Sequence, residues 1–207
     1  YQRFLAVKRL PIYRIRGSSA WFPDEYANRI GVTLEQAKAT AYAPGVGKLF
    51  DYQRDITALA IRKKKFAVFA DCGLGKTMMF LEYVRHVYNN ELPRDKRLLI
   101  VSPLMVVKQT LDEAQAWYGK LLPIQRVEAK ELSGWLTRSD QGIRIGVTNY
   151  EALRTDTPQG NLACLVLDES SMLKSMYGKW GATCIRLGRG IDWKLCCTGT
   201  PAPNDRI

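Results

Sequence analysis

The residues best suited to chemistry lie between positions 70 and 77, which read Ala-Asp-Cys-Gly-Leu-Gly-Lys-Thr. An apolar run precedes them and a helix-length stretch follows. Glycines in such a loop let the backbone curl, so that its N–H groups point at phosphate oxygens. The lysine is expected to reach the terminal phosphates, and the threonine hydroxyl to ligate magnesium. We therefore predict a site for a nucleoside triphosphate. The loop residues expected to bind the nucleotide are Gly73, Leu74, Gly75, Lys76 and Thr77.

A pair of acidic residues follows a second apolar run. Asp168 and Glu169 come directly after Leu165-Val166-Leu167. Ligands of open α/β sheets bind at the carboxyl ends of the strands, so both carboxylates should lie near the phosphate loop. We expect Asp168 to hold magnesium and Glu169 to orient and deprotonate an attacking water. A lone acidic pair is usually a solvated turn, but the phosphate loop upstream favours the catalytic interpretation.

The elements that must position these residues alternate regularly. Apolar or β-branched runs predict strands at residues 66–70, 98–101, 143–147, 164–167 and 194–198, with a weaker one at 123–127. Helices are expected at residues 76–88, 106–117, 151–154 and 175–187. This alternation is typical of a mostly parallel sheet covered by helices on both faces. We predict an α/β domain over residues 49–207, preceded by a small, partly helical extension over residues 1–48.

The extension offers two interpretations. Residues 24–30 and 34–42 could form two helices, with glycine- and proline-containing breaks at residues 17–19 and 44–47. The Ala27 to Gly31 spacing is compatible with a helix-turn-helix that reads DNA. The favoured alternative is an ordinary helical hairpin that packs on the next domain.

Composition narrows the class of protein. The 207 residues carry a formal net charge of +11, which suits a polyanionic partner but also a merely basic surface. No apolar run approaches the roughly 18–20 residues that a membrane span needs. The five cysteines form no CxxC pair, and three of them lie in apolar runs, so we expect small core residues in a reducing cytoplasm. The sequence starts at Tyr1 rather than methionine, so we expect it to be a piece of a longer protein.

Taken together, the motifs resemble those of the first RecA-like lobe of superfamily 2 helicases and translocases, in the family's order. Residues 70–77 match motif I, residues 168–171 (Asp-Glu-Ser-Ser) motif II, and residues 198–201 (Thr-Gly-Thr-Pro) motif III. The resemblance implies a RecA-like P-loop fold that hydrolyses ATP with Mg²⁺. It further implies that Gln53, in Leu-Phe-Asp-Tyr-Gln, recognises adenine. Residues implied to couple the motifs are Ser171, Thr198 and Thr200.

Finer features resemble the Swi/Snf-like branch of double-stranded DNA translocases, with bacterial and phage helicases carrying Asp-Glu-Ser-Ser as the nearest likeness. By this resemblance, the phosphates of one DNA strand run past Ser102, Pro103, Thr148 and Asn149. The alternative is that these are only strand-end turns. The basic residues 62–65 are expected to be a solvated helix end rather than a DNA contact.

The resemblance also implies partners. Catalysis should need a second RecA-like lobe that supplies an arginine, and no motif of that lobe is found in the 207 residues. A nuclease or methyltransferase partner is possible, and the cytoplasm of a bacterial or phage-infected cell is the expected location. Two rivals remain open: a non-hydrolysing, nucleotide-gated scaffold domain, and an RNA helicase lobe. Intact Lys76 and Glu169 disfavour the first, and Leu173-Lys174 disfavours the second.

Overall fold

A computed structural model describes residues 2–17, 19–32, 42–45, 47, 49–139, 142–173 and 178–200. The chain divides into two compact units, Tyr1–Thr40 and Ala41–Ile207. The division falls before residue 48, where the sequence suggested the extension would end. Residues 42–45 belong to the larger unit and contact Glu82 and Arg85 within it.

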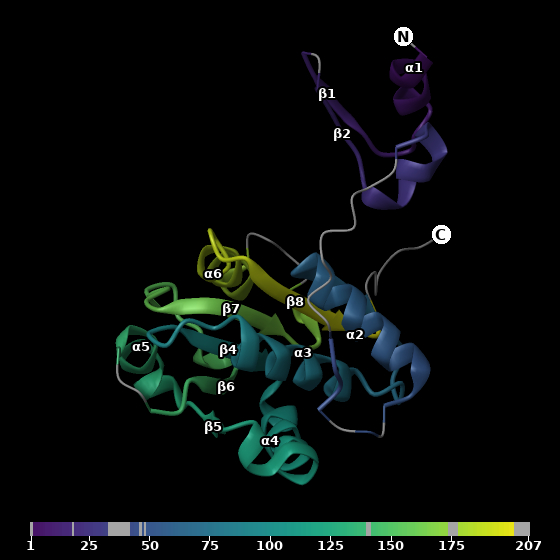
Figure 1. Ribbon diagram of the computed structural model, residues 1–207. Helices are drawn as coiled ribbons and strands as arrows, with labels where there is room; N and C mark the ends of the chain where they lie inside the picture. The colour runs from purple at the N-terminus through teal and green to yellow at the C-terminus, as the bar shows by residue number, and fades with distance from the viewer. Residues whose placement is uncertain are drawn as a thin grey trace. The chain divides into compact units, whose positions relative to one another are not determined.

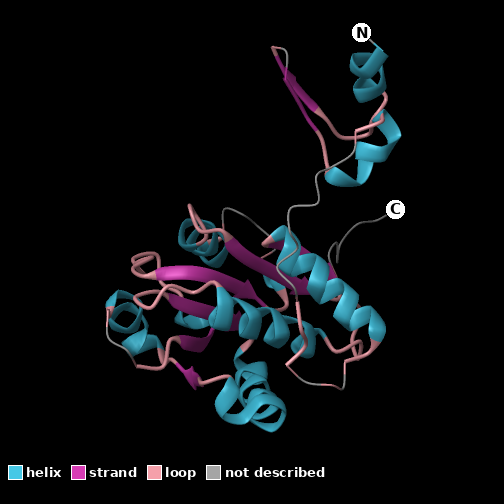
Figure 2. Cartoon of the chain, in the orientation of Figure 1, coloured by secondary structure: helices cyan, strands magenta, loops and turns pink. Residues whose placement is uncertain are grey.

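The larger unit is built on a six-stranded sheet in which every neighbouring pair of strands is parallel (Figures 1 and 2). The strand order is β3-β8-β7-β4-β6-β5. The strands are β3 (Lys65–Phe69), β4 (Arg97–Ser102), β5 (Ile124–Arg126), β6 (Ile145–Asn149), β7 (Leu162–Leu167) and β8 (Trp193–Thr198). All six residues of β4 are buried, because this strand lies inside the sheet with both faces covered. The predicted α/β fold is confirmed.

Helices cover both faces of the sheet. The described helices are α2 (Asp51–Lys63), α3 (Lys76–Asn90), α4 (Leu104–Tyr118), α5 (Ala129–Thr137) and α6 (Lys179–Leu187). Short 3₁₀ turns are η2 (Gly119–Leu121), η3 (Tyr150–Ala152) and η4 (Ser170–Met172). One hydrophobic core joins α2, α3 and α4 to the sheet, and a second joins α5, η3 and α6 to it.

Several elements differ from the sequence prediction. Helix α5 was not predicted; it contains Gly134, a poor helix former, and buries the apolar side chains Leu132, Trp135 and Leu136. Of α2, only the basic end was expected. The predicted helix at 151–154 is the 3₁₀ turn η3. The last predicted helix begins at Lys179, and residues 174–177 lie outside the described residues.

The smaller unit contains α1 (Gln2–Lys8), the antiparallel strands β1 (Arg14–Arg16) and β2 (Ser19–Trp21), and the 3₁₀ helix η1 (Asp24–Ile30). Its own core is formed by Val7, Leu10 and Ile30. The helix predicted at 24–30 is present as η1, whereas residues 33–41 lie outside the described residues. The helix-turn-helix interpretation therefore stays untested.

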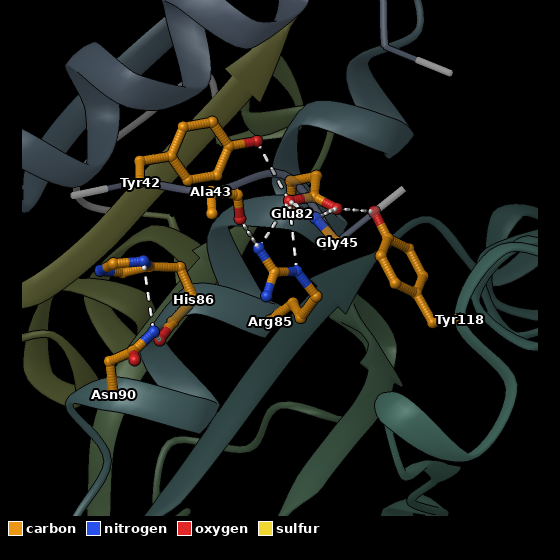
Figure 3. Close-up of polar contacts among 8 residues, drawn as sticks. All are labelled: Tyr42, Ala43, Gly45, Glu82, Arg85, His86, Asn90 and Tyr118. Carbon is orange, nitrogen blue, oxygen red and sulfur yellow. Dashed lines mark hydrogen bonds and ion pairs between the residues drawn. The ribbon is translucent and has the colours of Figure 1, made fainter. Parts of the chain in front are cut away.

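Within the larger unit, a buried carboxylate of α3 binds residues 42–45 (Figure 3). Glu82 of α3 is fully buried and accepts hydrogen bonds from the phenols of Tyr42 (3.0 Å) and Tyr118 (2.8 Å). The backbone N–H of Gly45 donates to the same carboxylate, and Arg85 forms an ion pair with it at 3.0 Å. Burial, and then the neighbouring Glu82 charge, raise the pKa of Tyr42 and Tyr118, so both phenols stay protonated donors. The Glu82 carboxylate thus has four partners.

The cysteines are free. Cys164, Cys184 and Cys197 are buried, Cys196 is half-buried and Cys72 is exposed. No helix among the described residues is long and apolar enough to cross a membrane.

Candidate nucleotide site

The predicted phosphate loop connects β3 to α3. Gly73 and Gly75 both have positive φ, +82° and +71°, which side chains of L-residues rarely adopt. At Gly75 a Cβ would also lie 2.3 Å from Nε2 of Gln53, so a side chain here would have to displace that amide as well as adopt the strained backbone. Helix α3 begins at Lys76, and the first N–H groups of a helix have no partner within it. These N–H groups and the helix dipole make this end of α3 suited to an anion.

Lys76 lies at the centre of the loop. Its ammonium donates to the carbonyls of Ala70 (3.0 Å) and Asp71 (3.3 Å), and only 10% of its side chain is exposed. It also lies 3.6 Å from Oε1 of Glu169. A Cβ at Gly199 would come within 3.4 Å of the ammonium, so the segment after β8 passes close to this cation.

Asp168 directly follows β7, where its N–H donates to the Val101 carbonyl (2.8 Å) and its oxygens accept three hydrogen bonds. Ser102 donates its hydroxyl to Oδ2 (3.1 Å), and the backbone N–H of Glu169 donates to Oδ1 (3.0 Å). The phenol of Tyr150 donates to the Asp168 carbonyl (2.6 Å). Burial raises the pKa of Asp168 to about 6, although the hydrogen bond from Ser102 acts in the opposite direction.

Glu169 links the loop to the segment after β8. It adopts a positive φ of +46°, which turns the chain sharply after β7. While Oε1 faces Lys76, Oε2 accepts a hydrogen bond from the hydroxyl of Thr198 (3.3 Å). The N–H of Thr200 donates to the same hydroxyl oxygen (3.1 Å). The structure therefore brings Lys76, Glu169, Thr198 and Thr200 together.

Thr77 and Ser171 have no described hydrogen bond of their own at this site. Thr77 is the second residue of α3, next to the loop lysine. Ser171 lies in η4 and is half-buried, whereas its neighbour Ser170 donates to the Cys197 carbonyl of β8 at 3.3 Å. Within the described residues, Ser170 is thus hydrogen-bonded to β8, and the coupling role of Ser171 stays a prediction.

Gln53 lies beside the loop but its amide is occupied. The side chain is buried, its Oε1 accepts from the N–H of Phe50 (3.1 Å), and its Nε2 donates to the Leu74 carbonyl (3.2 Å). The phenol of Tyr52 donates to the same carbonyl (3.2 Å). The start of α2 is thus bonded directly to the phosphate loop. Contact with adenine would require the amide to exchange at least one of these bonds.

The residues predicted to contact DNA lie at the ends of two adjacent strands, where Ser102 and Asn149 are register partners. Ser102 and Thr148 are both buried, and the Thr148 hydroxyl donates to the Val127 carbonyl (2.8 Å). Both hydroxyls are therefore engaged within the protein and cannot reach a phosphate in this structure. Asn149 and Pro103 are half-buried, and the Asn149 amide donates to Glu151 (2.7 Å).

The donor set fits magnesium bound with a nucleotide. Mg²⁺ prefers oxygen ligands and usually takes one or two from protein, leaving the rest to phosphates and water. The buried carboxylate of Asp168 and the hydroxyl of Thr77 have that character. No group of three or more histidine, cysteine or acidic side chains among the described residues could hold a metal unaided.

Sequence reasoning missed the polar residues that support these ligands. Ser102 contacts Asp168, Tyr150 contacts the Asp168 carbonyl, and Tyr52 contacts the loop. A detectable signal existed for Ser102, since a polar residue at the end of an otherwise apolar strand points to a partner at the sheet edge.

Comparison with known proteins agrees with this geometry. Residues 21–207 match the SNF2-related domain family. The Sulfolobus solfataricus SWI2/SNF2 ATPase core in complex with double-stranded DNA is similar in structure, with a TM-score of 0.59 and 17% identity over 81% of this chain. The UvsW helicase of bacteriophage T4 gives a TM-score of 0.56 and 13% identity over 85% of this chain. These likenesses confirm the RecA-like fold.

The chain spans only 35% of the Sulfolobus chain and 68% of the UvsW chain. A search of curated proteins gave no match. The family match nevertheless extends over residues 21–207 of a chain of 207 residues. On that coverage, the chain belongs to the family of SNF2-related domains.

Proposed function

We propose that this chain is the ATP-binding lobe of a DNA-dependent ATPase motor, a helicase or double-stranded DNA translocase. The observation that carries the proposal is the distance of 3.6 Å between Nζ of Lys76 in the phosphate loop and Oε1 of Glu169. The loop cation and the strand-end carboxylate form an ion pair here, and both lie where a terminal phosphate and its attacking water are expected in a phosphate-loop site.

Each residue has a distinct role in this proposal. The Lys76 ammonium exchanges its carbonyl partners Ala70 and Asp71 for phosphate oxygens and stabilises charge that develops there. Thr77 and Asp168 would hold Mg²⁺, which when bound neutralises phosphate charge. Glu169 accepts the proton of the attacking water at its carboxylate, which the Thr198 hydroxyl orients through Oε2.

Motion along DNA is proposed from charge and from likeness. The net charge of +11 favours a polyanion, and the Sulfolobus relative was solved with double-stranded DNA. Because the chain covers 35% of that relative, we propose that a second RecA-like lobe completes the site. An arginine from such a lobe contributes about 10³–10⁵ to the rate in related ATPases.

The test is ATP turnover by the full-length protein with duplex DNA of arbitrary sequence. Lys76→Ala should abolish DNA-stimulated turnover, and Glu169→Gln should keep ATP binding while losing hydrolysis. Lys65→Ala is the matched control, because Lys65 is an exposed lysine that pairs with Asp192 on the surface. Turnover by Glu169→Gln at the wild-type rate would remove the proposed base. ATP binding without any turnover in the wild type would favour a scaffold instead.

A further inference from the structure

The smaller unit presents a two-stranded hairpin whose two faces differ in character. In the antiparallel register, Arg14 lies opposite Trp21 and Arg16 lies opposite Ser19. Directly paired residues share a face, and side chains along a strand alternate between faces. Arg14, Arg16 and Trp21 therefore lie on one face. Ile15 lies on the other and packs against the core of this unit.

We call Arg14, Arg16 and Trp21 the hairpin face. Trp21 is 53% exposed, and both arginines are exposed. A hollow of about 380 Å³ opens here, and its described lining consists of the same three residues. Within the part of the chain that the structure describes, no ion pair involves either arginine. The face thus offers two guanidinium groups and an indole ring to a ligand.

The chemistry of this face suits a nucleic acid. An indole offers a flat surface on which any base can stack, and guanidinium groups bind phosphates in a bidentate manner. Residues 1–40 contain seven lysines and arginines but only three acidic residues, which adds a general attraction for a polyanion. A single exposed tryptophan would need no explanation, but one flanked by two arginines around a hollow does.

We propose that the hairpin face binds single-stranded nucleic acid, with an unpaired base stacked on Trp21 and the adjacent phosphates on Arg14 and Arg16. A duplex is disfavoured because its bases stack on one another and leave no ring face for the indole. The proposal does not depend on ATP hydrolysis. Nor does it follow from the family match, which begins at residue 21 and leaves out both arginines.

Photocrosslinking with the full-length protein tests this assignment. A bromouracil-substituted DNA strand should crosslink to the peptide that contains Trp21. Trp21→Ala should weaken binding of a thymidine oligomer by about 5- to 150-fold, the usual worth of one stacked base. Trp21→Phe should restore much of it, which separates stacking from misfolding. The double variant Arg14→Ser/Arg16→Ser should make the slope of log K against log salt concentration shallower by about 1.4, since each phosphate contact on a single strand contributes about 0.7 to that slope.

Controls separate this surface from the ATPase site. Arg9→Ser removes an exposed charge from the same unit outside the hairpin face and should change affinity much less. Lys76→Ala should leave the crosslink at Trp21 intact, whatever becomes of ATP turnover. Parallel assays with single-stranded DNA and RNA identify the preferred strand. Equal competition by blunt duplex DNA for the crosslink at Trp21, or a Trp21→Ala variant that binds like Arg9→Ser, would overturn the proposal.

Discussion

The hydroxyl of Ser102 donates a 3.1 Å hydrogen bond to Oδ2 of Asp168, and so joins the ends of two neighbouring strands, β4 and β7. Both residues are buried. The bond orients the carboxylate and opposes the rise in its pKa that burial causes. A residue first assigned to DNA phosphate contact is therefore a support for the proposed magnesium ligand.

Ser102→Ala should weaken binding of the Mg²⁺–nucleotide complex by about tenfold, the lower end of the usual effect of removing a partner of a metal ligand. It should also reduce stability by about 1–3 kcal/mol, because a buried carboxylate oxygen loses its donor. Nucleotide titration with and without Mg²⁺ measures the first effect. Ser133→Ala, on the exposed side of α5, is the control. Mg²⁺-independent weakening in Ser102→Ala would contradict the role.

Two glycine-to-alanine changes should alter the free energy of unfolding in opposite directions. Gly75→Ala must hold an L-residue at a φ of +71° and displace Gln53, so we expect a loss of at least about 1–2 kcal/mol and impaired nucleotide binding. Gly134→Ala, inside α5 with nothing within 4 Å of the new Cβ, should stabilise the protein by about 0.5–1 kcal/mol. Urea unfolding measures both. If the two variants moved stability in the same direction, the loop geometry would be misassigned.

Glu82→Ala should destabilise the larger unit by about 3–5 kcal/mol. The change leaves Arg85 without its carboxylate partner and removes the acceptor shared by two phenols and a backbone N–H. Tyr118→Phe removes one donor and should cost about 1–2 kcal/mol. Tyr13→Phe, at an exposed position of the smaller unit, should change little. Calorimetric measurement of thermal unfolding ranks the three variants. Any other order of destabilisation would contradict the role of Glu82 as a shared acceptor.

His86 should make stability fall in mild acid. It is the chain's one histidine, and its buried Nε2 has no hydrogen-bond partner among the described residues. Burial lowers its pKa below the ordinary 6.5. Its neutral form therefore contributes stability that is present above about pH 6.5 and is lost as the pH falls towards the folded-state pKa. Asp168, whose pKa is raised, acts in the opposite direction over the same range.

The His86 contribution is isolated by comparing urea midpoints at about pH 7.5 and about pH 5.5 in the wild type and in His86→Leu. The variant should lose less stability than the wild type between the two values. An equal loss in both proteins would show that His86 is not the group that titrates.

The sequence predicted the sheet and the phosphate loop because both leave strong local patterns. Buried parallel strands appear as continuous apolar runs, and the loop needs glycines at fixed positions. Helix α5 was missed because it is short and contains Gly134. The hairpin of the smaller unit was missed because strands of three residues show no period.

Side-chain partners were harder to predict than elements. The order of strands and the direction of each side chain decide that Ser102 faces Asp168 and that Thr148 faces Val127. The occupied amide of Gln53 likewise depends on how α2 packs against the loop. None of these contacts is local in sequence, so composition and spacing cannot reveal them.

The strand order also constrains how the protein is made. Strand β3, which leads into the phosphate loop, pairs within the described sheet only with β8, which is synthesised after the other five strands of that sheet. The strands β4, β5 and β6 can pair with one another earlier in synthesis. A nascent chain that stalls before residue 193 would therefore expose an unpaired β3 and an unformed nucleotide site, as a client for chaperones rather than an enzyme.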